Sequence, residues 1–268
     1  MKILKYFILL SVVVVSVQTQ EVSAKKNLRA KAWYVAKLNG KKVYSSEKAT
    51  KVRSIASISK IMAMLVVLEK GLILDKKTTM IKNDWVVAKG GCRTRLKVGK
   101  SYTNRDLLHA AVMGSDNRAV PALGRAVGLN PELLVDEMNK RAKLMGLKHT
   151  KFVEPTGIDH DNVSTAKEIL YILKAASMNR VLSIVMSKAS YDAKEVGTGR
   201  KITYNNTNLL TRKRKVVVGK TGFNSSAGYC LATVVKIKNV GPVAFVILGS
   251  SSKYSRFADF RKLRKKLF

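Results

Sequence analysis

The sequence predicts an α/β protein of the α+β kind, in which helices flank one antiparallel five-stranded sheet and a helical subdomain is inserted into the middle of the chain. Three observations favour this fold class. Two strand-like segments stand near the start, three β-rich segments stand near the end, and helix-forming segments fill the space between them. We therefore expect both ends of the chain to complete a single sheet.

The first residues have the pattern of a secretory signal. A basic start, Met1 to Lys5, precedes an apolar run that ends at Val17, and the small residues Ser23 and Ala24 follow. An uncleaved membrane anchor is the alternative, but it needs a longer apolar run. We expect a signal peptide over residues 1–24, cleaved after Ala24, and one exported domain over residues 25–268.

The elements before the insertion are two strands and a central helix. Residues 32–38 and 41–44 predict strands around the Asn39-Gly40 turn. Ser57 opens a helix whose residues from Ile61 to Leu68 are nearly all apolar, so we expect it to be buried on most sides. Gly71 is expected to end this helix.

The insertion is expected at about residues 72–200 and to be mainly helical. A capping-box pattern at Thr103 and Asp106 starts one helix, Asn130-Pro131 starts a second that ends at Gly146, and residues 164–177 form a third. Strands follow at 215–218, 229–237 and 243–248. Residues 255–267 predict a basic amphipathic helix, which we expect to pack on the sheet; a membrane-surface helix is the alternative.

The composition is strongly basic and includes two cysteines. Lysine and arginine number 51 against 17 acidic residues, for a formal charge of +34. Such a charge attracts polyanions, and anionic wall or envelope polymers are candidate partners, whereas export and the lack of a recognition motif argue against nucleic acid. Basic residues scattered over a solvated surface are the alternative. Whether Cys92 and Cys230 pair or stay reduced is left open by the sequence.

Three short motifs stand in an order that points to nucleophilic catalysis. Ser57 and Lys60 are three residues apart, so they share one face of a helix, where a lysine amine can act as base for a serine hydroxyl. Ser115-Asp116-Asn117 and Lys220-Thr221-Gly222 follow. Alone, each motif is common, and the second could simply cap a helix with Asp116 bracing its turn. Together and in this order they are specific.

The three motifs resemble those of the low-molecular-mass penicillin-binding proteins, the D-alanyl-D-alanine carboxypeptidase and endopeptidase family. The resemblance implies a β-lactamase-like, penicillin-binding-protein transpeptidase fold, with the active site between the sheet and the helical subdomain. It covers almost the whole chain after residue 30. Several further segments are similar to the endopeptidase branch: Trp85 to Leu96, Ser115 to Ala119, Phe152 to Gly157, Asn162 to Ala166 and Gly219 to Gly228.

The resemblance implies a set of catalytic residues. Ser57 would attack the carbonyl of a D-Ala peptide bond, and Lys60 would accept its proton. Lys220, across the cleft, is expected to lower the pKa of Lys60 because a nearby cation disfavours the ammonium form. Ser115 would relay a proton to the leaving amine. Asn117 would hold the peptide group of the substrate through its amide.

The third motif is expected to bind substrate. Lys220 and the Thr221 hydroxyl would hold the substrate carboxylate, and Gly222 would let the substrate approach the strand closely. The backbone N–H groups of Ser57 and Phe223 would form the oxyanion hole. The expected substrates are stem peptides of peptidoglycan in the periplasm or cell envelope, and β-lactams are expected as covalent inhibitors of the same serine.

Alternative functions remain within and outside this chemistry. A carboxypeptidase uses the same residues, and a class A β-lactamase would need a glutamate to activate water, for which Glu154 is the candidate. A non-catalytic wall-binding module is the third alternative. Arg93 and Arg95 are candidates for a second substrate carboxylate. No cofactor and no metal are expected, since the histidines lack metal-ligand spacing: His109, His149 and His160.

Overall fold

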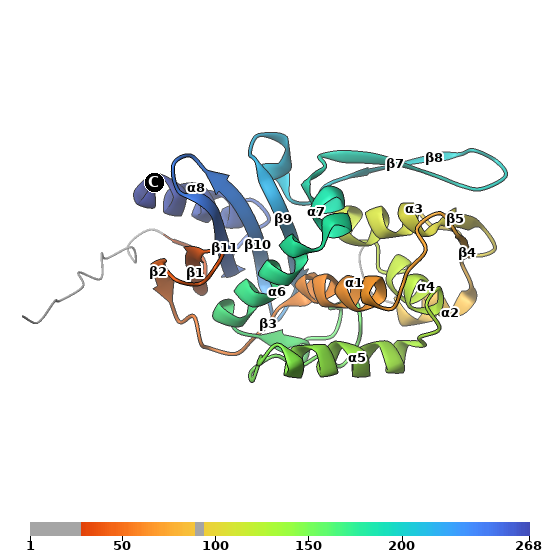
Figure 1. Ribbon diagram of the computed structural model, residues 1–268, viewed down its shortest axis with the longest axis horizontal. Helices are drawn as coiled ribbons and strands as arrows, with labels where there is room; N and C mark the ends of the chain where they lie inside the picture. The colour runs from red at the N-terminus through yellow and green to blue at the C-terminus, as the bar shows by residue number, and fades with distance from the viewer. Residues whose placement is uncertain (1–27, 89–93) are drawn as a thin grey trace, which may run out of the picture.

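Both ends of the chain contribute strands to one antiparallel sheet, as predicted (Figure 1). The computed structural model describes residues 28–88 and 94–268, so the predicted signal peptide lies outside the described residues. The strand order is β2-β1-β11-β10-β9, which places β9 at an edge. The strands are β1 (Ala32–Lys37), β2 (Val43–Glu47), β9 (Val216–Asn224), β10 (Gly228–Ile237) and β11 (Gly241–Ser250).

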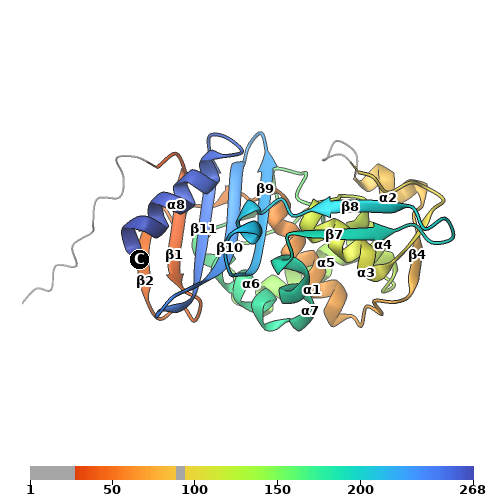
Figure 2. The same cartoon turned by 90° about the horizontal axis from the view of Figure 1, so that it is seen from above.

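One face of the sheet, called here the outer face, is covered by the C-terminal helix α8 (Ser255–Leu267), which Figure 2 shows lying across the strands. Alternate residues of β1 and β11 point to this face, among them Trp33 and Phe245, and both are buried. Phe260 of α8 packs edge-on against Phe245, with ring centroids 4.7 Å apart. The prediction that this helix packs on the sheet is confirmed.

Helices α1 (Lys60–Glu69), α6 (Ala166–Met178) and α7 (Arg180–Ser187) lie on the opposite face, called here the inner face. Helix α1 is buried over its first eight residues, and Gly71 follows its end with a φ of +84°, as its sequence predicts. In the described part of the chain no single helix is long and apolar enough to cross a bilayer. Only α6 and α7 taken together have that length and composition, and they are bent by 101° where they meet.

The region between α1 and β9 contains the remaining helices and most of three short two-stranded sheets, one of which also uses β3, a strand that precedes α1. Thr103 and Asn130 cap their helices as predicted, each accepting a hydrogen bond from a backbone N–H of the first turn. The short strands lack a long period-two pattern, which explains why the sequence did not predict them. The elements are α2 (Lys82–Val87), α3 (Asn104–His109), η3 (Ala110–Gly114), α4 (Ala119–Arg125), α5 (Pro131–Leu144), β3 (Arg53–Ser54) with β6 (Val163–Ser164), β4 (Lys77–Thr79) with β5 (Ser101–Thr103), β7 (Ser190–Lys194) with β8 (Lys201–Asn205), and η4 (Leu209–Arg212).

Several boundaries differ from the sequence prediction, and two of the differences have a clear physical reason. The turn after β1 is longer than the predicted two residues, because Asn39 accepts a hydrogen bond from the Lys41 N–H and the second strand begins only at Val43. Strand β9 continues to Asn224, well past the predicted end at Val218. Its second half is paired with β10 although it contains two glycines, so pairing outweighs the low strand propensity there.

A histidine is buried beside the hairpin formed by β7 and β8. His109 Nδ1 lies 2.7 Å from the Arg105 carbonyl oxygen, and its Nε2 lies 3.4 Å from Lys188 Nζ. Its ring stacks on Tyr191, with centroids 3.5 Å apart, and Asp106 accepts a hydrogen bond from the Tyr191 hydroxyl. Burial, with Lys188 and Arg105 nearby, lowers the pKa of His109 to about 4, although its bond to the Arg105 carbonyl and Asp106 oppose this.

This histidine predicts a loss of stability at mildly acidic pH. Below about pH 6.5 an unfolded histidine binds a proton, whereas folded His109 stays neutral until about pH 4, so the free energy of unfolding falls as the pH decreases through this window. We expect the wild type to lose about 2 to 3 kcal/mol more than a His109→Gln variant between pH 7.5 and 4.5. Urea unfolding at both pH values measures this, and equal losses in the two proteins would contradict it.

Candidate active site

Ser57 lies in a tight turn that precedes helix α1. The turn is a 3-10 helix over Ala56–Ser59, and Ala56 adopts a φ of +47°, which is rare for a residue with a side chain. Ser59 Oγ donates to the Ala56 carbonyl at 2.9 Å and accepts from Asn162 Nδ2 at 3.1 Å. These bonds hold the strained turn and so fix the position of the Ser57 side chain.

Two glycines allow other parts of the chain to approach this turn closely. A Cβ atom on Gly157, whose φ is +81°, would lie 2.0 Å from the Ala56 carbonyl oxygen and 2.7 Å from the Ser57 nitrogen. A Cβ atom on Gly222 of β9 would lie 2.8 Å from the Ile55 carbonyl oxygen. The Ser57 turn is therefore clamped between the loop at Gly157 and the edge strand.

The Lys60 amine is buried and surrounded by oxygen atoms. Its Nζ lies 3.0 Å from Ser57 Oγ, 2.5 Å from Asn117 Oδ1 and 2.5 Å from the Thr156 carbonyl oxygen. Because an ammonium or amine donates through its N–H groups, Asn117 must direct its oxygen at Lys60. The amide nitrogen of Asn117 is then the group that can donate into the neighbouring cavity.

Ser115 faces Ser57 from the helical region and is held by a lysine of the sheet. It follows the π-helical turn η3 and adopts a left-handed conformation with a φ of +62°. Lys220 Nζ of β9 donates to Ser115 Oγ at 2.8 Å and to the Thr221 carbonyl at 2.9 Å, and Lys220 is fully buried. The sheet and the helical region are thus linked across the site.

Asp116 points away from the cavity into a hydrogen-bond network. Its carboxylate accepts from Thr94 Oγ1 at 2.9 Å, Tyr204 OH at 3.1 Å and the backbone N–H groups of Arg118 and Arg95 at 3.1 and 3.3 Å. Burial raises the pKa of this carboxyl group, while the hydrogen bonds oppose the shift. These contacts brace the turn that carries Ser115, which is the role suggested by the sequence.

The remaining predicted residues follow Lys220 on β9. Thr221 Oγ1 donates to Thr207 Oγ1 at 2.8 Å. Phe223 is 54% exposed, and its ring stacks on Tyr229 with centroids 4.2 Å apart. An apolar platform therefore borders the open edge of the strand.

These groups meet at a cavity of about 820 Å³. Six of the eight predicted site residues line it, and Lys60 and Lys220 lie buried directly behind Ser57 and Ser115. The structure therefore brings all eight together. The six lining residues are Ser57, Ser115, Asn117, Thr221, Gly222 and Phe223.

Comparison with known proteins agrees with this geometry. The family model described as D-alanyl-D-alanine carboxypeptidase matches residues 18–252. The chain belongs to this peptidase family. The family predicted from the three motifs is confirmed.

The relatives and solved structures that this chain resembles have different named activities. The chain is 34% identical to D-alanyl-D-alanine endopeptidases of Escherichia coli and Pseudomonas aeruginosa, over 86% and 85% of this chain and 74% and 73% of those proteins. It is 32% identical to the carboxypeptidase DacF of Bacillus subtilis, over 78% of this chain and 54% of that protein. The DD-transpeptidase of Streptomyces K15 is 30% identical, with a TM-score of 0.82 over 89% of this chain and 97% of that one. The predicted transpeptidase-like fold is confirmed.

Arg256 also lines this cavity, and the sequence analysis did not identify it. Its side chain is buried, donates to the carbonyls of Gly222 and Cys230 at 3.1 and 3.3 Å, and lies over the Tyr229 ring. Burial lowers its pKa to about 10. Arg256 stands in the basic C-terminal helix, where its charge resembled that of the exposed residues around it, so no sequence signal separated it.

Cys230 is a free, buried thiol, while Cys92 lies outside the described residues.

Glu154 is a structural residue of the loop behind Ser57. Its carboxylate accepts hydrogen bonds from the backbone N–H groups of Thr156, Gly157 and Asp159 and from the side chain of Asn162. It thereby shapes the loop that delivers the Thr156 carbonyl to Lys60. The Glu-Pro-Thr-Gly run was visible in the sequence, but its role depends on contacts that no spacing rule reveals.

Of the two arginines considered for a second carboxylate, Arg95 is the one that lies in the described part of the chain. Arg93 lies outside the described residues. The exposed Arg95 guanidinium sits over the Tyr204 ring, 4.5 Å from its centroid, and Arg95 is not among the lining residues. The structure therefore gives no support to Arg95 as a substrate-binding residue.

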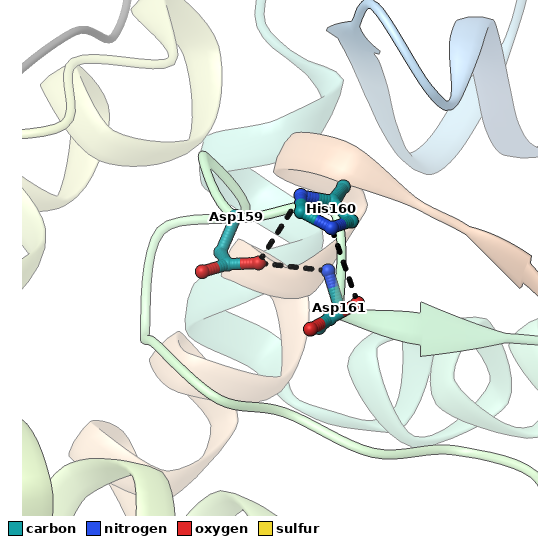
Figure 3. A group of neighbouring side chains, drawn as sticks. All are labelled: Asp159, His160 and Asp161. Carbon is teal, nitrogen blue, oxygen red and sulfur yellow. Dashed lines mark hydrogen bonds and ion pairs between the residues drawn. The ribbon is translucent and has the colours of Figure 1, made fainter.

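One group of side chains has ligand types that suit a metal ion. Asp159, His160 and Asp161 are neighbours in one surface loop, as Figure 3 shows, and their side chains are 45–69% exposed. His160 lies 3.7 Å from Asp159 and 3.5 Å from Asp161, and the Asp161 N–H donates to Asp159. Loop geometry and surface ion pairing account for this cluster.

Proposed function

We propose that this protein is an exported serine-type D,D-peptidase of peptidoglycan, most suited to opening D-Ala–diaminopimelate cross-links as an endopeptidase. The observation that carries the proposal is the contact of 3.0 Å between Lys60 Nζ and Ser57 Oγ at the cavity, opposite Ser115. The two endopeptidase relatives, which align over about three quarters of their length, support the endopeptidase over the carboxypeptidase.

Acylation follows from how the Lys60 amine is held. With two N–H bonds directed at Asn117 Oδ1 and the Thr156 carbonyl, a neutral amine presents its lone pair to Ser57 Oγ. Lys60 then takes the Ser57 proton while Oγ forms a bond to the D-Ala carbonyl carbon. The backbone N–H groups of Ser57 and Phe223 would stabilise the oxyanion, each by about 3 to 4 kcal/mol.

Ser115 is positioned to complete the transfer. As the carbon–nitrogen bond breaks, the leaving amine takes a proton from Ser115 Oγ, which lies beside Lys220 Nζ and can be reprotonated through it. The proton that Lys60 took from Ser57 replaces the one that Ser115 gave up, so it leaves on the amine product and Lys60 becomes neutral again. Water then attacks the ester carbon and loses a proton to Lys60, which passes it to Ser57 Oγ as the bond between Ser57 and the carbonyl carbon breaks. The freed peptide ends in a carboxyl group, which ionises.

Substrate binding would use the cavity wall formed by β9. Thr221 and Lys220 would hold the carboxylate next to the scissile bond, Asn117 would donate its amide to the substrate carbonyl, and Gly222 leaves room for an extended peptide beside the strand. β-Lactams would acylate Ser57 in the same way. No step here calls for a cofactor or metal.

The bonds made by Glu154 weigh against a β-lactamase. A class A enzyme uses its glutamate to activate water, whereas Glu154 is engaged by backbone N–H groups of its own loop. We therefore expect a lasting penicillin adduct on Ser57. A non-catalytic wall-binding module would not need the complete set of groups around Lys60.

The location and further partners stay predictions. The family and the relatives are named for D-alanyl-D-alanine, and we infer export to the cell envelope. The charge of +34 is proposed to hold the protein on anionic wall or envelope polymers, which salt-dependent co-sedimentation with isolated cell walls would test.

The function is tested by incubating mature protein with purified cross-linked muropeptide dimers and monomeric pentapeptides and identifying the products by mass spectrometry. We expect dimers to split into monomers, with a Ser57→Ala variant as the inactive control. Loss of one D-Ala with intact dimers would identify a carboxypeptidase, and new dimers would identify transfer to an amine. The absence of any Ser57-dependent product would overturn the proposal.

A further inference from the structure

The cavity continues past the edge strand β9 toward the outer face of the sheet. Ser57 belongs to the helical side of this strand. The far part of the cavity is lined by Leu209 and Arg212 of η4 and by Lys253 and Arg256, next to and within α8. Leu209 packs against the apolar cluster of the outer face, which also contains the buried residues of α8. A ligand bound at Ser57 can therefore extend around the edge of the sheet.

The far part of the cavity is cationic. The described residues that line the cavity include Arg212, Lys253 and Arg256 but no acidic residue. Arg256 is buried and already donates to two backbone carbonyls. The exposed Arg212 side chain makes no hydrogen bond or ion pair with any residue that the structure describes, and Lys253 Nζ contacts only the Tyr254 ring there, at 5.8 Å. Two cations are thus available to an anionic ligand.

The backbone that carries Arg212 is rigidly attached to the sheet. Asn208 precedes the short helix η4 and is fully buried. Its Oδ1 accepts from the Leu210 N–H at 3.2 Å and its Nδ2 donates to Thr233 Oγ1 of β10 at 3.1 Å. Because the backbone is already fixed, only the Arg212 side chain has to be ordered when a ligand binds.

Lys253 has a similar support. Ser252 and Ser255 bind each other reciprocally, with the Ser252 N–H donating to Ser255 Oγ at 2.7 Å and the Ser255 N–H donating to Ser252 Oγ at 3.1 Å. Lys253 lies inside this closed turn, where the chain leaves β11 for α8. Its backbone is fixed at the rim of the cavity.

We propose that Arg212 and Lys253 bind a carboxylate of the leaving group and thereby select cross-linked peptides over pentapeptides. The inference rests on the proposed function, in which Ser57 holds the acyl group and Thr221 the carboxylate beside the scissile bond. A D-Ala leaving group has only that one carboxylate. The leaving group of a cross-link is a second stem peptide, whose further carboxylates extend beyond Thr221, toward the two cations.

The test compares kcat/KM for purified muropeptide dimers with kcat/KM for pentapeptides. Arg212→Gln and Lys253→Gln should each lower the ratio of dimer to pentapeptide about tenfold, which corresponds to about 1.4 kcal/mol. Lys213→Gln and Arg214→Gln are matched controls, because both residues are exposed, lie beside Arg212 and do not line the cavity. The controls should leave the ratio within about twofold. An equal fall in the controls, or an unchanged ratio in the cavity variants, would overturn the inference.

A binding measurement separates this inference from the proposed function. The dimer is titrated into Ser57→Ala protein, with and without the Arg212→Gln and Lys253→Gln changes, and the expected loss of affinity is again about tenfold per change. If the wild type cleaves nothing but this loss is seen, the proposed function fails and the binding site stands. If the wild type cleaves dimers while neither the ratio nor the affinity changes, the function stands and the inference fails.

Discussion

Replacing Lys60 with glutamine should slow acylation of Ser57 by penicillin about 10³-fold. The amide of glutamine can still donate to the oxygens of Asn117 and Thr156, but it has no basic lone pair for the Ser57 proton. Loss of the base rather than loss of folding should therefore dominate. Stopped-flow measurement with a fluorescent penicillin gives the acylation rate, and thermal unfolding shows whether the variant is folded.

Lys70→Gln is the matched control for this change. Lys70 stands at the other end of the same helix, is 39% exposed in its side chain and pairs with Glu137 at 3.1 Å. The substitution is the same, and the surface ion pair that it removes contributes at most about 1 kcal/mol to stability. We expect acylation within about twofold of wild type. If Lys60→Gln acylates within tenfold of wild type while folded, Lys60 is not the base.

Replacing Gly157 with alanine should both destabilise the protein and disable Ser57. The new Cβ would stand 2.0 Å from the Ala56 carbonyl oxygen and 2.7 Å from the Ser57 nitrogen, and backbone atoms cannot move aside as a flexible side chain does. We expect a loss of at least about 3 kcal/mol in the free energy of unfolding. Displacement of the Ser57 turn should lower acylation by at least about 10²-fold. Urea unfolding and penicillin kinetics measure the two effects.

The Gly146→Ala variant measures the cost of a left-handed alanine where the added Cβ meets no other atom. Gly146 has a similar φ of +71°, but nothing lies within 4 Å of its added Cβ. That variant should lose only about 1 kcal/mol, the strain of a left-handed alanine, and acylate normally. Equal losses of stability in the two variants would show that the close contact between Gly157 and the Ser57 turn does not account for the destabilisation.

The candidate catalytic groups were predictable because their spacing reflects chemistry that few residue types perform. A serine and a lysine one helical turn apart predicted the contact that the structure shows, and the order of the later motifs predicted which side chains would face it. The apolar run after Lys60 predicted a buried helix, and the strand segments at both ends predicted the sheet. In each case a local pattern was enough.

The contacts that hold these groups could not be predicted. The Thr156 carbonyl reaches Lys60, Asn162 reaches Ser59 and Tyr204 reaches Asp116 through bonds between residues far apart in sequence, with no periodic signal. Arg256 was hidden among other basic residues of its helix. These features depend on how the loops cross in three dimensions, and only the folded chain reveals them.

The pairing of β1 with β11 determines when the sheet can form during synthesis of the chain. Ala32 aligns with Leu248, so the sheet cannot close until nearly the whole chain has been synthesised. Lys220 and the edge strand also come late, after all the residues that form the helical region. Contacts of such long range make folding slow. The complete site therefore cannot assemble while the chain emerges, which is compatible with the export proposed above.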